Sequence, residues 1–295
     1  MTRIPLEDWY AAGRTLGFRG HEIFTRLDGP PAAPVLLLIH GFPTASWDWE
    51  ALWAPLAQRW RVLALDLLGY GRSDKPRGHA YSLMEQADLC EHFLATEGVG
   101  AYHVLAHDVG DTVAQELLAR QAEPGERPRL RSLGLLNGGL FPETHRPAAI
   151  QKLLLSPLGP LVARLASRDS LARTLRAIFG PSTQPDDALL DAFWSLVSAQ
   201  GGNAVMHRLI RYIPERRRHR ARWVGALQAA RIPLKLIDGA FDPISGAHMA
   251  ARYRELVPDA DVTLLEGIGH YPQVEAPAQV LAAYLEFRAR TDAAA

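Results

Sequence analysis

The sequence predicts an α/β fold in which helices cover both faces of a mostly parallel central sheet and a helical cap is inserted into this core. Short apolar runs rich in Val, Leu and Ile recur along the chain, as in parallel strands that are buried on both faces. Segments with helical spacing separate these runs. From Leu140 to about Gly225 the strand rhythm stops, and the sequence becomes helical and rich in Arg and Leu. These three observations together favour the α/β class.

The elements follow one another in a regular order. We expect strands at residues 21–26, 34–39, 61–67, 102–106, 130–136, 233–238 and 261–265. Helical spacing predicts a helix over residues 82–95 and another over residues 112–120. The predicted division is a core made of residues 1–139 and 226–295, with a cap made of residues 140–225 between its two parts.

Composition limits the classes of partner and of location. The 295 residues include 32 Lys and Arg and 32 Asp and Glu, so no net charge favours nucleic acid or an anionic membrane as the main partner. The single cysteine, Cys90, excludes an internal disulfide framework. Acidic residues near Met1 are untypical of a signal peptide, so we expect a cytoplasmic protein. No apolar run approaches the roughly 18 residues that a transmembrane segment needs.

Motifs for cofactors and metals are missing. Residues 69–74 contain glycines, but they lack the third glycine and the helix-opening turn of a dinucleotide site. No phosphate-binding loop, paired cysteines or His-Glu-x-x-His pattern occurs. We therefore expect neither a cofactor nor a metal.

The central motif is an apolar strand that runs into a tight turn at Asp108. Small residues follow in the turn, and helical spacing begins directly after it. A strand–turn–helix of this kind projects one side chain above the sheet as a nucleophile. A carboxylate attacking an ester would give a reactive anhydride, so a carboxylate nucleophile suits a saturated carbon, such as that of an epoxide or an alkyl halide. The expected intermediate is an ester on Asp108.

Hydrolysis of such an ester requires a base. Asp108 is ionised at neutral pH without help, but water must lose a proton as it attacks the ester carbon. His270 follows the last predicted strand, and Asp242 follows the strand before it. The order nucleophile, acid, histidine is that of an α/β-hydrolase. Asp238 is the less favoured acid because it falls at the end of the predicted strand, before the turn.

The negative charge that develops on the ester oxygen needs hydrogen-bond donors. His40, Gly41, Phe42 and Pro43 follow the predicted strand at residues 34–39. We assign the backbone N–H groups of Phe42 and Val109 as the oxyanion hole.

These residues resemble those of α/β-hydrolases with an aspartate nucleophile, the group of soluble epoxide hydrolases and haloalkane dehalogenases. The turn at His40, together with Asp108, Asp242 and His270, matches that pattern over nearly the whole chain. Residues 136–147 and 222–227 are similar to the epoxide-hydrolase-like branch of the mesoderm-specific transcript protein. The resemblance implies the α/β-hydrolase fold and a cofactor-free hydrolase.

Departures from the family pattern separate its activities. Haloalkane dehalogenases usually hold the halide with a tryptophan directly after the nucleophile, but this chain has Val109 there. Epoxide hydrolases protonate the opened oxygen with tyrosines of the cap. Tyr212 is the only tyrosine of the predicted cap, so the resemblance implies that it is the donor, with water or His207 as a second donor. We therefore favour an epoxide hydrolase. Haloalkane dehalogenase and a non-catalytic binding protein with this fold are the alternatives.

The predicted pocket is aromatic and aliphatic, which favours a small apolar substrate that reacts with water. Its predicted lining residues are Trp47, Phe179, Phe193, Trp194, Leu209 and Ile213. Residues 153–165 are expected to pack the cap onto the core, with a contact in a homo-oligomer as the alternative. The basic run 216–222 is expected to be a solvated helix face, with a surface for anionic lipid or for a partner as the alternative.

Overall fold

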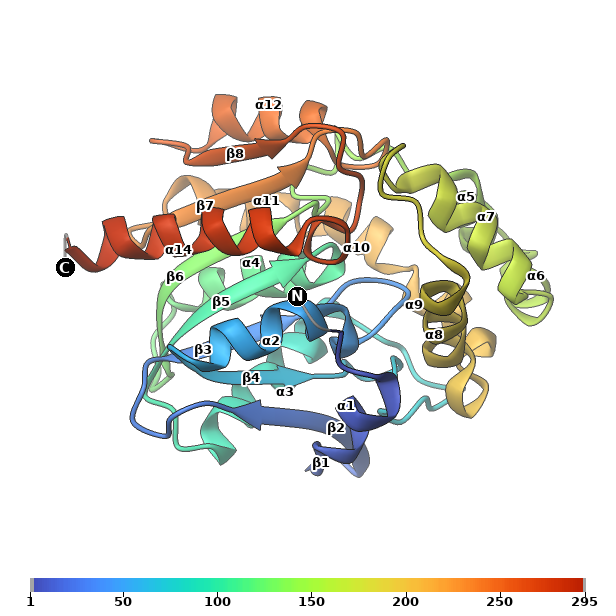
Figure 1. Ribbon diagram of the computed structural model, residues 1–295, viewed down its shortest axis with the longest axis horizontal. Helices are drawn as coiled ribbons and strands as arrows, with labels where there is room; N and C mark the ends of the chain where they lie inside the picture. The colour runs from blue at the N-terminus through green and yellow to red at the C-terminus, as the bar shows by residue number, and fades with distance from the viewer. Residues whose placement is uncertain (1–2, 294–295) are drawn as a thin grey trace.

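An eight-stranded sheet forms the centre of the computed structural model, which describes residues 3–293 (Figure 1). The strand order is β1-β2-β4-β3-β5-β6-β7-β8. β2 pairs antiparallel with β1 and β4, and the pairs from β4 through β8 are parallel. The strands are β1 (Arg14–Phe18), β2 (His21–Asp28), β3 (Val35–Ile39), β4 (Arg61–Leu65), β5 (Ala101–His107), β6 (Arg129–Leu136), β7 (Leu234–Gly239) and β8 (Val262–Leu265).

The predicted fold class is confirmed, and each of the seven predicted strands lies within two residues of an observed one. The structure adds β1, which the sequence analysis missed. Within β1 only Phe18 is buried, because the strand lies at the sheet edge and pairs with β2 alone. An edge strand of this kind carries no apolar run that would reveal it.

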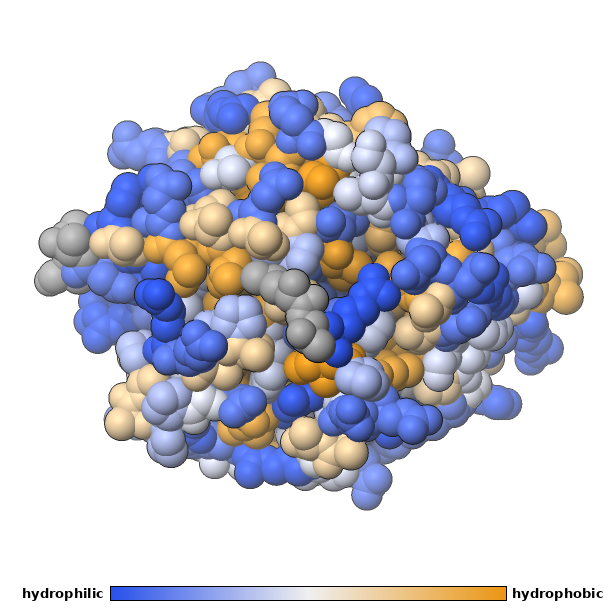
Figure 2. Space-filling view, in the orientation of Figure 1, coloured by the Kyte–Doolittle hydropathy of each residue, from blue (hydrophilic) through white to orange (hydrophobic). Residues whose placement is uncertain are grey.

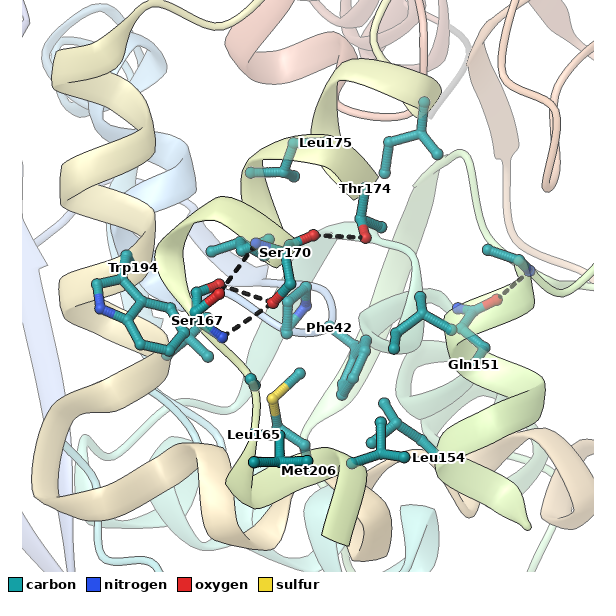
Figure 3. Close-up of a pocket in the computed structure, with 18 of the residues that line it drawn as sticks. Phe42, Gln151, Leu154, Leu165, Ser167, Ser170, Thr174, Leu175, Trp194 and Met206 are labelled. Carbon is teal, nitrogen blue, oxygen red and sulfur yellow. Dashed lines mark hydrogen bonds between the residues drawn. The ribbon is translucent and has the colours of Figure 1, made fainter. Parts of the chain in front are cut away.

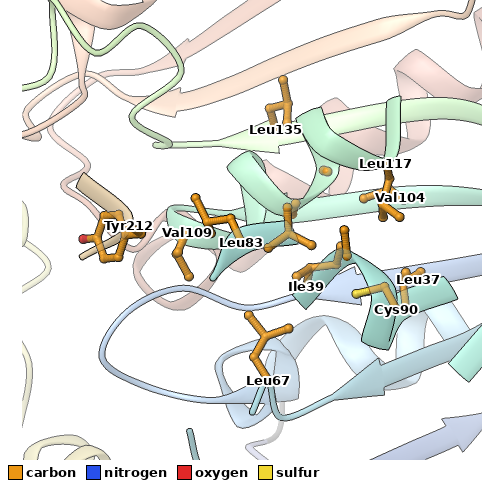
Figure 4. Packing of buried hydrophobic residues seen from close by; sticks show 14 of the residues in the cluster. Leu37, Ile39, Leu67, Leu83, Cys90, Val104, Val109, Leu117, Leu135 and Tyr212 are labelled. Atoms are coloured by element: carbon orange, nitrogen blue, oxygen red, sulfur yellow. The ribbon is translucent and has the colours of Figure 1, made fainter. Parts of the chain in front are cut away.

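Both faces of the sheet are covered by helices. In β3, Leu36 and Leu38 belong to the apolar cluster that includes α2 (Glu50–Ala57) and α14 (Pro277–Ala293). The alternating residues Leu37 and Ile39 belong to the cluster of the opposite face (Figure 4). That face is covered by α3 (Leu83–Thr96), α4 (Val109–Arg120), α11 (Arg220–Gln228) and α12 (Ala247–Leu256). The strand rhythm of the sequence therefore reflects burial on both faces.

The remaining core elements are short. They are α1 (Leu6–Ala11), η1 (Ser46–Trp49) and α13 (Pro272–Glu275). In α3, Cys90 is fully buried, and burial raises the pKa of its thiol. This is the environment of an inert cysteine.

Helices inserted after β6 lie beyond the carboxyl ends of the parallel strands (Figure 1). We call α5–α10 the cap. Its elements are α5 (Ala149–Leu155), α6 (Gly159–Arg164), α7 (Arg168–Ile178), α8 (Asp187–Ser198), η2 (Ala199–Val205), α9 (Met206–Leu209) and α10 (Tyr212–Arg218). The predicted boundary at Gly225 falls inside α11, which packs on α4 of the core. We therefore propose that the cap ends before Arg220.

The apolar segment at residues 153–165 packs differently from the expectation. Leu154 and Ala163 are buried and join α5 and α6 to the rest of the cap. Five other leucines of this segment are exposed rather than packed on the core: Leu153, Leu155, Leu158, Leu161 and Leu165. Within residues 3–293, no helix combines the length and the apolar character needed to span a membrane.

Candidate active site

The chain turns sharply at Asp108, between β5 and α4. Asp108 has φ 48° and ψ −106°, a backbone conformation that costs free energy in a residue other than glycine. Glycine permits the close packing around this turn, because a Cβ on Gly110 would lie 2.4 Å from the Ile39 carbonyl oxygen. A Cβ on Gly41 would lie 2.8 Å from that of Asp108. The packing of β3 and α4 thus holds the strained turn.

Two groups hold the buried Asp108 carboxylate. The Phe42 N–H donates to Asp108 Oδ2 at 3.0 Å. Arg216 Nη2 lies 3.5 Å from Asp108 Oδ1 and donates to the Asp108 carbonyl oxygen at 2.9 Å. Burial alone would raise the pKa of Asp108, but Arg216 and then His270 outweigh it, so the pKa lies below its usual value. Asp108 is therefore a carboxylate at neutral pH.

His270 and Asp242 form a buried pair. His270 Nδ1 lies 2.8 Å from Asp242 Oδ2. Burial would lower the pKa of His270, but Asp242 and then Asp108 raise it to about 9. Because Nδ1 is held by the carboxylate, Nε2 is the ring nitrogen that is free to exchange protons with a ligand. His270 also lines an apolar cavity between the core and the cap.

A set of donors fixes Asp242 in turn. Asn137 Nδ2 donates to Asp242 Oδ2 at 3.0 Å, and Ser245 Oγ donates to the same atom at 2.9 Å. The backbone N–H of Ile244 donates to Asp242 Oδ1 at 2.8 Å. Asp238, the less favoured acid, instead accepts from the Asn137 N–H at 2.7 Å. The structure therefore pairs Asp242, rather than Asp238, with the histidine.

His107 is a neighbour of the site that the sequence analysis did not assign. Its Nε2 lies 2.8 Å from the His270 carbonyl oxygen, and because a carbonyl only accepts, the ring must donate. Burial and the nearby His270 lower the pKa of His107 to about 3, so the ring is neutral. His107 is the last residue of β5, and its hydrogen bond attaches the loop that carries His270 to this strand end.

The predicted oxyanion donors are close to Asp108. The Phe42 amide already contacts the carboxylate. Val109 is the first residue of α4, where backbone N–H groups have no acceptor within the helix. Val109 lines a second, small cavity together with Leu209 and Tyr212. Figure 4 shows Val109 and Tyr212 among the packed apolar side chains.

An apolar cavity of about 270 Å³ lies between the core and the cap (Figure 3). Phe42 and His270 are core residues that line it, and the cap supplies Leu154, Leu175 and Met206 among others. Two hydroxyl groups of the lining are already satisfied by backbone carbonyls: Ser170 donates to that of Ser167, and Thr174 donates to that of Ser170. The cavity therefore offers mainly aliphatic surface to a ligand.

Of the predicted lining residues, Trp194 alone lies in this cavity. Phe179 stacks on Tyr271 with a centroid distance of 5.5 Å, and Phe193 packs on the same ring. Trp47 packs edge-on against Phe193, and its indole N–H donates to the Ile4 carbonyl. Those aromatic residues form a layer that supports the His270 loop. The prediction that these three residues line the cavity is wrong, and so is the same prediction for Leu209 and Ile213. All five side chains pack into the two apolar clusters instead.

Tyr212 is buried beside the site. Its ring lies 5.8 Å from the ring of Phe42, and its hydroxyl accepts from Gln151 Nε2 at 3.2 Å. Gln151 lines the main cavity, so the hydroxyl is one side chain removed from it. Burial, and then Asp108, raise the pKa of Tyr212, which keeps the phenol protonated. The alternative donor His207 does not line this cavity.

The basic run at residues 216–222 is only partly a solvated face. Arg217 and Arg218 are exposed as expected. The expectation is wrong for Arg216, which is buried and donates from Nε to Thr112 Oγ1 at 2.7 Å. Arg222 pairs with the buried Glu116. Sequence reasoning missed Arg216 because its neighbours in the run are charged and exposed.

Within the described range, no group of three or more His, Cys, Asp and Glu side chains is placed to hold a metal ion. The polar residues of the site instead form hydrogen bonds and ion pairs with one another.

Comparisons with known proteins agree with the observed fold. The model of the alpha/beta hydrolase fold family matches residues 34–277. The mesoderm-specific transcript protein of Mus musculus is 42% identical over 292 residues, which cover 96% of this chain and 87% of that protein. The expected resemblance to that branch is therefore confirmed.

Two solved structures share the fold at lower identity. A loop variant of the haloalkane dehalogenase DbeA from Bradyrhizobium elkanii has a TM-score of 0.80 and 21% identity, with coverage of 96% of this chain and 97% of that one. The epoxide hydrolase CorEH has a TM-score of 0.76 and 18% identity, with coverage of 94% and 98%. At this identity, both comparisons show the fold alone.

Proposed function

Because the chain belongs to the alpha/beta hydrolase fold family, we propose that it is an epoxide hydrolase that opens an apolar epoxide to a diol. One observation carries the proposal: an ionised Asp108 lies in a strained turn next to His270, which forms part of the lining of an apolar cavity and is paired with Asp242. A carboxylate nucleophile suits attack at saturated carbon, as argued above.

In the first step, Asp108 attacks one carbon of the epoxide. Oδ2 accepts the Phe42 N–H, so we assign Oδ1 as the attacking atom and Oδ2 as the future ester carbonyl oxygen. The ring carbon–oxygen bond breaks, and its electron pair passes to the epoxide oxygen. We assign Tyr212 as the proton donor, since its phenol is held neutral and an alkoxide is a stronger base than a phenolate. This role requires Gln151, which donates to the Tyr212 hydroxyl and lines the cavity, to move aside when the substrate binds.

In the second step, water attacks the ester carbon of Asp108. His270 Nε2 takes the proton from water, while the Phe42 and Val109 N–H groups stabilise the oxyanion. Collapse of this intermediate releases the diol, whose oxygen takes the proton back from His270. Asp108 is then left as a carboxylic acid. Its proton returns to the Tyr212 phenolate, which restores both the Asp108 carboxylate and the Tyr212 phenol for the next cycle.

Val109 supports epoxide opening over halide release. A departing halide needs N–H donors, and the residue after Asp108 offers an apolar side chain in their place. The Trp47 indole is not free for this role, because its N–H donates to the Ile4 carbonyl. Haloalkane dehalogenase activity therefore remains the second candidate, and a fold retained only for binding is the third.

A substrate panel tests the proposal. We expect diol from aryl or aliphatic epoxides and no halide from alkyl halides, with turnover abolished in Asp108→Asn. Asp111→Asn is the matched control in the same helix and retains turnover, because burial and Asp238 raise the pKa of Asp111 and favour its neutral form. Absence of diol from every epoxide, or full activity of Asp108→Asn, would overturn the proposal.

A further inference from the structure

We propose that the cap docks on the surface of an anionic lipid bilayer through the exposed leucines of α5, α6 and their flanking turns, with the mouth of the cavity facing the lipid. We call this surface the leucine face; it consists of Leu153, Leu155, Leu158, Leu161 and Leu165. Within residues 3–293, Phe241 is the one other large hydrophobic side chain that is exposed. Apolar surface is therefore concentrated in one short segment.

The side chains of the leucine face remain exposed although α5 and α6 are packed against the rest of the cap. α5 and α6 pack on each other and on α9, and α6 also packs on η2. Leu154 and Ala163 are buried in these contacts. Leu158, Leu161 and Leu165 nevertheless remain 59%, 55% and 71% exposed. Hydrophobic residues show at the right-hand tip of Figure 2, where Figure 1 places α6. Exposed apolar side chains that are concentrated in one short segment in this way mark an interaction site.

Charge around the leucine face favours an anionic partner. Between Glu143 and Asp169 the sequence contains basic residues and no acidic one. Lys152 and Arg164 are exposed, and neither forms an ion pair within the described chain. Apolar side chains flanked by unpaired cations fit a bilayer whose headgroups are negative.

The same charges disfavour a second copy as the partner. A two-fold interface would place the leucine face against itself. It would then bring Lys152 and Arg164 of one copy close to those of the other, and the segment between Glu143 and Asp169 supplies no acid to balance them. A bilayer offers apolar chains for the leucines and negative headgroups for both cations.

The leucine face is continuous with the cavity. Leu165 is exposed and also lines the cavity, together with Val162 and Leu154 (Figure 3). An apolar molecule dissolved in the bilayer therefore meets an apolar path that ends at His270. This geometry delivers a membrane-partitioned substrate without passage through water. Docking itself does not depend on epoxide chemistry.

Sedimentation with vesicles tests docking. The full chain is mixed with vesicles of phosphatidylcholine or of an equimolar mixture with phosphatidylglycerol, and the bound fraction is measured. We expect binding to the mixed vesicles and weaker binding to phosphatidylcholine. Leu158→Ser/Leu161→Ser should weaken binding at least about tenfold, since less apolar area enters the lipid. Lys152→Glu/Arg164→Glu should remove the preference for anionic vesicles.

A matched charge reversal controls for net charge. Arg59 and Arg129 are exposed at the amino ends of β4 and β6, the end of the sheet opposite the site. We expect Arg59→Glu/Arg129→Glu to bind like the wild type. Failure of the wild type to sediment with either vesicle would overturn the proposal, as would equal binding by all variants. A dimer that Leu158→Ser/Leu161→Ser dissociates, without vesicle binding, would show that a second copy covers this face.

A fluorescent label tests which side faces the lipid. Cys90 is buried, so an environment-sensitive dye can be directed to Leu165→Cys or to Arg129→Cys. We expect a blue shift on anionic vesicles for the first position and none for the second. A shift at Arg129→Cys alone would contradict the proposed orientation. Because neither measurement uses turnover, failure of docking and failure of the proposed reaction are distinguishable.

Discussion

His270 and Asp108 influence each other's charge. In the free protein Asp242 and then Asp108 outweigh burial and raise the pKa of His270 to about 9. An alkyl ester on Asp108 would remove one of these negative charges. The pKa of His270 should then fall, which makes its ring neutral at the stage at which the proposed mechanism needs a base.

This coupling gives a pH prediction. Hydrolysis of the Asp108 ester should accelerate as pH rises through the pKa of His270, because only neutral His270 accepts a proton from water. The rate should reach its plateau above an apparent pKa that lies below the value of about 9 in the free protein, since the ester lacks the charge of Asp108. Single-turnover kinetics measure the rate of this step. A hydrolysis rate that does not change with pH would contradict the assignment of His270.

At the residue level, the sequence indicated Asp108, Asp242 and His270 through their order and their places after strands. Arg216, Asn137 and the orientation of His107 could not be predicted in this way. Their roles depend on contacts between segments far apart in the chain, such as Arg216 with Asp108 and Asn137 with Asp242. The prediction of the cavity lining was mostly wrong for the same reason. Aromatic character alone does not tell whether a side chain faces the cavity or packs in the layer behind its wall.

Between elements, Arg216 connects the cap helix α10 to the core helix α4. Its guanidinium donates to Thr112 Oγ1 and to the carbonyl oxygen of Asp108. A buried cation of this kind leaves an uncompensated carboxylate when it is removed.

Arg216→Gln should therefore destabilise the protein. We expect the free energy of unfolding to fall by about 3 kcal/mol, as for the loss of one partner of a buried ion pair. The adjacent Arg217 is exposed, so Arg217→Gln is the control and should change it by less than about 0.5 kcal/mol. Urea denaturation measures both values. Equal stability of the two variants would show that Arg216 does not link α10 to α4.

The seven predicted strands were visible because burial on both faces demands continuous apolar runs. β1 was not, since it lies at the edge and is mostly exposed. We also propose that the cap ends before α11, because α11 is helical like the cap but packs on α4 of the core.

At the scale of the whole molecule, the sheet brings the three segments of the site together. β5 ends directly before Asp108, β7 leads to Asp242, and the loop after β8 carries His270. The cap then covers this edge and supplies most of the cavity wall. The fold class could be predicted from the sequence, whereas the size and opening of the cavity depend on how the cap helices pack. The leucine face became apparent only once that packing was known.

The covalent ester on Asp108 is the central claim, and mass spectrometry of His270→Ala tests it most directly. This variant keeps the nucleophile but lacks the base for hydrolysis. Incubated with an epoxide that the wild type converts, it should gain the full mass of the epoxide on the peptide that contains Asp108. An unmodified variant, or an adduct on another residue, would contradict the account.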